Sequence, residues 1–109
     1  MKKVNTLILP VLLLPLSVYA AQVYGRLKED GRAIPAKVKI EVVCNGQTYT
    51  GETDNYGSYS VYASVKGRCV FKVYYKGQSP TFELYSYDNP VRYDFDLVLQ
   101  NGQYTLRRK

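Results

Sequence analysis

Cys44 and Cys69 are the residues whose chemistry is easiest to predict, because the chain contains two cysteines and no histidine. Two thiols without CxxC spacing and without histidine neighbours make a poor metal site or redox motif. In an oxidising compartment the same two thiols can pair with each other. We therefore expect a structural Cys44–Cys69 disulfide, with no metal and no cofactor.

The lack of histidine also argues against catalysis, since it removes the usual general base and the Ser-His-Asp and Cys-His arrangements. Asp94 and Asp96 form the nearest carboxylate pair, and we interpret them as solubilising charges on the exposed side of one strand. Asp54 and Asn55 offer too few oxygens for calcium and fit a capped turn better. We expect a protein that is not an enzyme.

Tyrosine is the compositional feature that could carry a function, with twelve in the chain and no tryptophan. We expect Tyr59, Tyr75 and Tyr93 to point into a core. Outward tyrosines mixed with cations are typical of binding surfaces, although they also occur as ordinary strand residues. The candidate face is Tyr24, Arg26, Lys39, Tyr62, Lys72, Tyr74 and Lys76, and a second candidate, a contact loop, is Tyr85, Tyr87 and Asp88.

Two strands are predicted to position the cysteines. Residues 36–44 alternate apolar and charged side chains, and residues 69–76 repeat the period, with Cys44 and Cys69 on the apolar sides. Antiparallel pairing with the cysteines opposed places Glu41 across from Lys72 on the outer side. The same register predicts the inner pairs Val42–Phe71 and Ile40–Val73.

The rest of residues 21–109 contains no convincing helix, but strands separated by turn signals every eight to twelve residues. We interpret this as an all-β, seven- or eight-stranded two-sheet sandwich. The predicted strands are 22–28, 36–44, 47–53, 58–63, one from 69, one between the turns at 77–80 and 88–90, 91–99, and one after residue 102.

Two details of this pattern are specific enough to test. Asn45-Gly46 and Asn101-Gly102 predict two-residue hairpins, the second with Tyr104 opposite Leu99 and Leu106 opposite Leu97. The strand at 91–99 is expected to turn Val91, Tyr93, Phe95, Leu97 and Leu99 inward. We interpret the basic end Arg107-Arg108-Lys109 as a solvated chain end.

The first twenty residues have the order of a cleavable signal peptide: a positive start, an apolar run broken by Pro10 and Pro15, and the small-residue exit at Ala20. The run is too short for a spanning helix, so no stable membrane anchor is expected after cleavage. We expect cleavage after Ala20 and a secreted or periplasmic domain at 21–109.

Three stretches resemble the carboxypeptidase regulatory-like domains, which have the transthyretin-like (prealbumin-like) sandwich. They are Val23-Tyr24-Gly25-Arg26-Leu27 with Gly31 and Ile34-Pro35-Ala36-Lys37-Val38, then Thr53-Asp54-Asn55-Tyr56-Gly57-Ser58-Tyr59, and Gly67-Arg68-Cys69 through Tyr75-Lys76-Gly77. The resemblance implies an accessory or interaction domain. Two catalytic relatives of this sandwich depend on histidines that this chain lacks, so their activities are not carried over.

Without Lys2 and Lys3, the exported chain has 13 basic and 9 acidic residues, a modest excess. Nucleic acid is therefore not an expected partner. We expect a protein-interaction or structural accessory module that contacts another envelope or secreted protein. The alternative is a carbohydrate-binding module that stacks sugars on its surface tyrosines.

Overall fold

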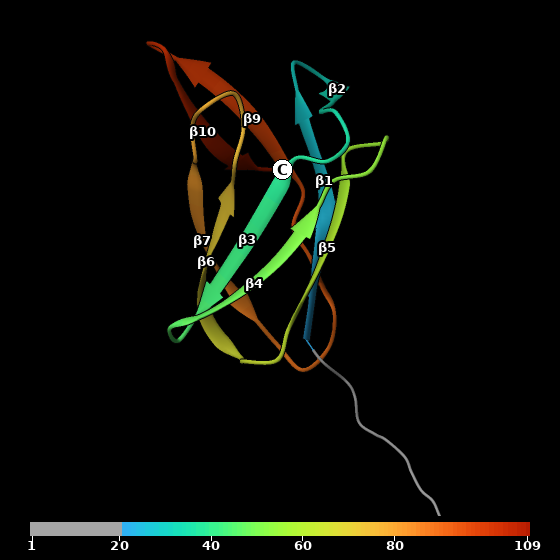
Figure 1. Cartoon of the computed structure of the whole chain (residues 1–109), viewed down its shortest axis with the longest axis vertical. Coiled ribbons are helices and arrows are strands. Elements are labelled where there is room, and N and C mark those ends of the chain that lie inside the picture. Colours follow the sequence, from blue (N-terminus) through green and yellow to red (C-terminus); the bar gives the residue numbers. More distant parts are fainter. Residues whose placement is uncertain (1–20) are drawn as a thin grey trace, which may run out of the picture.

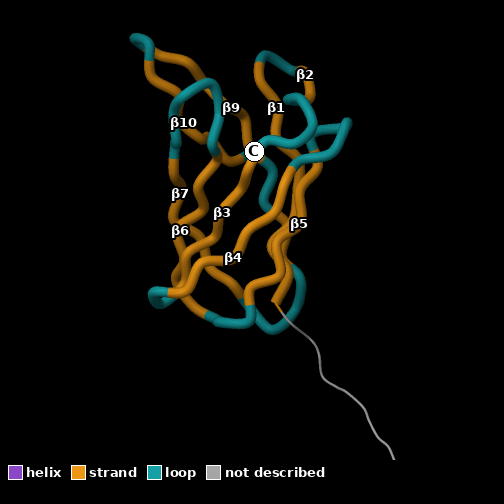
Figure 2. Tube along the Cα trace, viewed as in Figure 1, coloured by secondary structure: helices purple, strands orange, loops and turns teal. Residues whose placement is uncertain are grey.

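The computed structural model describes residues 21–109, so the predicted signal peptide at 1–20 lies outside the described residues. This part of the chain is all β, with ten strands in two sheets that pack as a sandwich (Figure 1). Loops gather at the two ends of the sandwich (Figure 2). Within 21–109, no helix is long and apolar enough to cross a membrane.

The first sheet is built around β1 (Ala21–Glu29). One edge of β1 pairs antiparallel with β5 (Ser58–Ala63) and then with the short β2 (Arg32–Ala33). The other edge pairs in parallel with β8 (Val91–Arg92) and β9 (Phe95–Gln100). β10 (Gln103–Arg108) completes the sheet beside β9. Strands from both ends of the chain are therefore neighbours.

The second sheet has the order β4-β3-β6-β7, all antiparallel. Its strands are β3 (Lys39–Cys44), β4 (Gln47–Glu52), β6 (Gly67–Val73) and β7 (Thr81–Ser86). The two sheets enclose one core, in which Phe71 stacks on Phe95 with ring centroids 4.9 Å apart. The predicted inward tyrosines are confirmed, since Tyr59, Tyr75 and Tyr93 are all buried.

The predicted disulfide and its register are confirmed. Cys44 and Cys69 are directly opposed and bonded, with their Cα atoms 4.3 Å apart. Glu41 faces Lys72 as predicted, and the inner pairs Val42–Phe71 and Ile40–Val73 are present. The chain-entropy effect of this link, which closes a loop with a sequence separation of 25, is about 3.5 kcal/mol.

Several strand limits differ from the predicted ones. The second predicted strand, 36–44, begins only at Lys39, because Lys37 has a φ of 67° and lies in a turn. The predicted fifth strand ends at Val73, three residues before Lys76, which is in a turn with a φ of 49°. The hairpins at Asn45-Gly46 and Asn101-Gly102 are confirmed, with positive φ at all four residues and Tyr104 opposite Leu99.

The predicted strand at 91–99 is interrupted at Tyr93 and Asp94, which separate β8 from β9. Gly25 allows the backbone of this segment to lie close to β1, because a Cβ atom there would lie 2.0 Å from the Tyr93 carbonyl oxygen. The inward placement of Leu99 was wrong: its side chain is 53% exposed. The β9–β10 hairpin projects past the end of the second sheet, and within residues 21–109 no strand faces its tip (Figure 1).

Side chains cover part of the backbone at the free edges of β7 and β10. The Tyr93 hydroxyl accepts from the backbone N–H of Tyr85 in β7 at 3.2 Å and lies 3.4 Å from the Tyr85 carbonyl oxygen. In β10, the backbone N–H of Tyr104 donates to Oε1 of Gln78 at 2.8 Å. Since an added strand needs such groups, these contacts disfavour binding by strand addition at either point.

Candidate binding surface

The seven residues of the predicted binding face do not form one surface. Tyr24, Arg26 and Tyr62 point outward from the first sheet, on β1 and β5. Three others lie on the outer side of the second sheet, and Lys76 lies in the turn after Tyr75 at one end of the sandwich. The three on the second sheet are Lys39, Lys72 and Tyr74.

We call the outer side of the first sheet the basic face. Tyr24 pairs with Ser60, and Tyr62 pairs with Gln22, so the two tyrosines are diagonal neighbours. Cations from three strands and the chain end outnumber the carboxylates on this side. The cations are Arg26, Lys28, Arg92, Arg107 and Lys109, and the carboxylates are Asp94 and Asp96.

Asp94 organises the centre of the basic face. Its Oδ1 accepts from the backbone N–H of Arg26 at 2.9 Å, and Nε of Arg92 donates to both of its oxygens, at 3.0 and 2.9 Å. Burial acts to raise the pKa of Asp94, but the hydrogen bonds from Arg92 and Arg26 outweigh it and lower this pKa overall. The carboxylate therefore stays ionised and holds the Arg92 guanidinium, whose Cζ lies 5.9 Å from the centre of the Tyr24 ring.

A small hollow of about 150 Å³ opens on the basic face, between β1 and the end of the chain. Its cationic lining comes from β1, β8 and the C-terminus, and Asp94 and Phe95 complete it. The four cations are Arg26, Lys28, Arg92 and Lys109. Among residues 21–109, neither Arg26 nor Lys28 has an ion pair with a carboxylate within 4.0 Å.

The basic end is exposed, as expected for a solvated chain end, but it is ordered in a strand. β10 continues to Arg108, whose Cζ lies 4.1 Å from the centre of the Tyr93 ring and whose Nη2 donates to the Arg92 carbonyl oxygen at 3.2 Å. The backbone N–H of Lys109 donates to the Asp94 carbonyl oxygen at 3.0 Å. These contacts order the chain end against β8, with Arg107 and Lys109 on the basic face and the Arg108 guanidinium over the buried Tyr93 ring.

We call the outer side of the second sheet the paired face, because its cations have carboxylate neighbours. Glu41 accepts from the Tyr74 hydroxyl at 2.8 Å and from Lys39 at 3.3 Å, while the ammonium groups of Lys39 and Lys72 lie 5.1 and 5.7 Å from the Tyr74 ring centre. The hydrogen bond from Tyr74 is the main reason that the pKa of Glu41 is lowered. Arg68 and Glu83 form a second pair at 3.6 Å, and Glu52 lies opposite Lys39, so three carboxylates match the three cations of this face.

The predicted contact loop is only partly a loop. Tyr85 belongs to β7, while Tyr87 and Asp88 follow that strand. Tyr85 and Tyr87 are both exposed, with ring centroids 6.4 Å apart. Asp88 forms an ion pair with Lys66 at 3.3 Å, which links the loops before β6 and after β7. These residues lie at one end of the sandwich, apart from the centre of the basic face.

At the other end, Lys76 belongs to what we call the Glu29 cluster: Glu29, Tyr75, Lys76 and Tyr104. Glu29 accepts from both tyrosine hydroxyls at 2.7 Å and from Lys76 at 3.4 Å. The hydrogen bond from Tyr75, then that from Tyr104, lowers the pKa of Glu29. Because Tyr75 follows β6 and the other tyrosine lies in β10, the cluster connects the two sheets.

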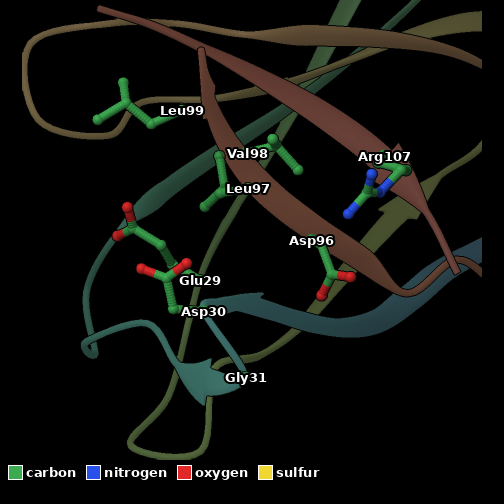
Figure 3. A pocket seen from close by; sticks show the side chains of 8 residues that line it. All are labelled: Glu29, Asp30, Gly31, Asp96, Leu97, Val98, Leu99 and Arg107. Carbon is green, nitrogen blue, oxygen red and sulfur yellow. The ribbon is translucent and has the colours of Figure 1, made fainter.

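A larger hollow, of about 510 Å³, lies next to this cluster, between the β1–β2 turn and the β9–β10 hairpin (Figure 3). Glu29 and Asp30 lie on one side of it, and Asp96 and Arg107 on the other. Since Glu29 already accepts three hydrogen bonds, this hollow is a weak candidate for a ligand-binding site. Within 21–109, no three histidine, cysteine, aspartate or glutamate side chains gather closely enough to hold a metal ion.

The turn at Thr53 to Ser58 works as a capped turn, as expected for Asp54. Oδ1 of Asp54 accepts from the backbone N–H groups of Tyr56 and Ser58 at 2.8 and 3.0 Å. Thr53 donates to the Pro35 carbonyl oxygen at 2.7 Å. Gly57 has a φ of 73°, and a Cβ atom there would lie 2.5 Å from the Leu27 carbonyl oxygen. The motif thus ties this turn to β1 and to the segment before β3.

The sequence did not predict four cations of the basic face, which are Lys28, Arg92, Arg107 and Lys109. The alternation of side chains along the strand could have revealed Lys28, since it points to the same side of β1 as Tyr24 and Arg26. The missing information was the parallel pairing of β1 with β8 and β9. That pairing joins residues about seventy positions apart, and no local pattern reveals it.

No family model matches this sequence, and no curated protein matches it either. Solved structures do resemble it, among them a "putative cell adhesion protein" from Bacteroides fragilis NCTC 9343, with 9% sequence identity and a TM-score of 0.48. The match covers 96% of this chain and 49% of the other, so the chain spans about half the length of that structure. At this level of similarity, the likeness says nothing about what the chain binds.

Proposed function

We propose that this chain is a non-enzymatic interaction module that binds another envelope or secreted protein through its basic face. The observation that carries the proposal is the placement of Tyr24 and Tyr62 beside Arg26 and Arg92 on one exposed sheet surface. Tyrosine and arginine are the residue types enriched in protein interfaces and in their energetic centres. The paired face has the same residue types, but Lys39 and Arg68 form ion pairs with carboxylates and Lys72 lies opposite Glu41.

Two observations support a role without catalysis. The chain has no histidine, which removes the commonest general base. Asp94 and Asp96, the nearest carboxylate pair, are engaged by Arg92 at 2.9 Å and by Lys109 at 3.8 Å. They contribute to the order of the basic face, so the geometry favours recognition.

Export is part of the proposal. The signal-like residues 1–20 and the Cys44–Cys69 disulfide both suit an oxidising compartment outside the cytoplasm. The intact mass of the protein from periplasm and culture medium tests this. We expect a chain that begins at Ala21, and a mass that retains Met1 to Ala20 would contradict export by this signal.

We propose also that the sandwich is of the transthyretin-like type. Support comes from the residues that carry the resemblance to the carboxypeptidase regulatory-like domains, because Thr53, Asp54 and Gly57 form one connected turn against β1. A Gly57→Ala variant tests this role. It should be clearly less stable than a Gly46→Ala variant, where a Cβ atom would meet nothing within 4 Å. Equal stability of the two variants would count against it.

In-cell chemical cross-linking followed by mass spectrometry tests the proposed function. We expect one envelope or secreted protein to be cross-linked to the wild-type chain, and the yield to fall sharply in Tyr24→Ala and Tyr62→Ala variants. Tyr74→Ala on the paired face is the matched control and should retain the cross-link. Loss only in the Tyr74→Ala variant would refute binding through the basic face.

A carbohydrate-binding module is the second candidate. The 61% exposure of Tyr62 favours it, since an exposed ring beside Tyr24 offers sugars a stacking surface. A glycan array separates the two functions. Saturable sugar binding that disappears in Tyr24→Ala and Tyr62→Ala variants would replace the protein-binding proposal.

A further inference from the structure

The small hollow on the basic face has the composition of an anion site. Its cations are contributed by three separate parts of the chain, and two of them, Arg26 and Lys28, have no ion pair with a carboxylate among residues 21–109. A volume of about 150 Å³ is several times the roughly 30 Å³ that one water molecule takes up in the liquid. The hollow can therefore hold a carboxylate with part of its side chain.

Asp94 prepares the hollow for an incoming anion, although it is itself negative. Its oxygens accept from Nε of Arg92 and from the Arg26 backbone N–H, so its charge is matched inside the protein. Among the described residues, the hydrogen bonds of the Arg92 guanidinium use Nε, which leaves its two terminal amino groups for a ligand. A planar guanidinium held in this way matches the two oxygens of a carboxylate.

The surroundings of the hollow indicate the kind of molecule that carries this carboxylate. Tyr24 adjoins Arg92, and Tyr62 lies diagonally across from Tyr24, so apolar contact area continues beyond the charges. Arg107 extends the positive charge on the same side through β10. An extended, acidic peptide segment complements such a surface, with one carboxylate in the hollow and others over the neighbouring cations.

We infer that the hollow of the basic face is a carboxylate-binding site, and that it recognises an aspartate- or glutamate-rich segment of the partner protein. The inference rests on the proposed function and names the chemistry of the partner.

Fluorescence anisotropy with the exported, disulfide-bonded protein tests it. The probe is a labelled peptide of alternating glutamate and glycine, and its control has glutamine for glutamate. The test variant is the R26Q/K28Q double, and the matched control is the K39Q/K72Q double on the paired face. Both doubles lower the net charge by the same amount, so only the position of the lost charge differs.

We expect the wild-type protein to bind the glutamate peptide and to prefer it clearly over the glutamine peptide. In R26Q/K28Q the Kd should rise about tenfold, because two charge pairs with the peptide are lost, while K39Q/K72Q should change it less than about twofold. Binding should also weaken as NaCl is raised from 0.05 to 0.5 M. Thermal melts check the fold of each variant. If R26Q/K28Q unfolds, the single variants R26Q and K39Q give the same comparison, since the Arg26 backbone N–H still reaches Asp94.

Three results would overturn the inference: equal loss in the two doubles, no preference for the glutamate peptide, or tighter binding of a uronic-acid oligosaccharide or short DNA. A chain that still cross-links a partner protein through the basic face but ignores the acidic peptide would refute the carboxylate site alone. If the chain neither cross-links a partner protein through the basic face nor binds the acidic peptide, the proposed function is refuted as well.

Discussion

The two outer faces of the sandwich contain the same residue types, tyrosine with lysine or arginine, but differ in how their charges are matched. On the paired face, Glu41 lies between Tyr74 and Lys39, and Glu83 accompanies Arg68. On the basic face, the carboxylate Asp94 is used to fix Arg92 and the backbone of β1, and other cations are left over. The proposed function rests on this difference, because the basic face keeps cations without ion pairs to carboxylates.

The sheets behind the two faces are also held differently, and the disulfide gives the largest expected effect. Cys44 and Cys69 link β3 to β6 in the second sheet, whereas the first sheet is held without a covalent link. We expect the Cys44→Ser/Cys69→Ser double to lose about 3.5 kcal/mol of unfolding free energy in urea titrations. Hydrogen exchange should show the larger loss of protection in β3 and β6. A loss below about 1 kcal/mol would mean that the second sheet does not depend on this link.

The Glu29 cluster gives the next largest effect, because it connects the two sheets. Glu29→Gln should lower the unfolding free energy by about 1–2 kcal/mol at pH 7, since it replaces an ionised acceptor of three hydrogen bonds. Glu52→Gln, on the exposed side of β4, is the control and should change little.

The same cluster predicts a pH dependence. The pKa of Glu29 is lower in the folded chain than the ordinary value of 4.5, so its contribution to stability is complete above pH 4.5. It is lost as the pH falls through the folded pKa, because the unfolded chain takes up the proton more readily. Urea titrations from pH 7 to pH 3 should therefore show a smaller decline for Glu29→Gln than for the wild type. Parallel declines would refute the lowered pKa.

The smallest expected effect is a difference in unfolding free energy between two variants, each of which changes one carboxylate on one of the two faces. Asp94→Asn should cost about 1 kcal/mol, because Asp94 accepts a hydrogen bond from the β1 backbone as well as from Arg92. Glu83→Gln should cost nothing measurable, because Glu83 pairs only with an exposed arginine. If chemical denaturation shows the same loss of unfolding free energy for both variants, the two carboxylates do not differ in their structural role.

The sequence predicted local features well, since they depend on neighbouring residues. Alternation in 36–44 and 69–76 was enough for the Cys44–Cys69 pair and its register, and Asn101-Gly102 was enough for the last hairpin. The sequence did not predict features that depend on the pairing or packing of strands far apart in the chain. The alternation of side chains along each strand showed that Tyr24 and Tyr74 both point outward. It did not show that they belong to different sheets, because that depends on strand pairings between distant parts of the chain. For the same reason, Leu99 fitted an inward pattern on a hairpin with no sheet opposite its tip.

Site-specific photo-cross-linking in cells shows which of the two faces contacts a partner protein. A photoreactive phenylalanine analogue replaces Tyr62 on the basic face or Tyr74 on the paired face, both exposed, at 61% and 39%. We expect a discrete cross-linked partner from position 62, lost in the R26Q/K28Q background, and none from position 74. A partner captured from position 74 and not from 62 would contradict it.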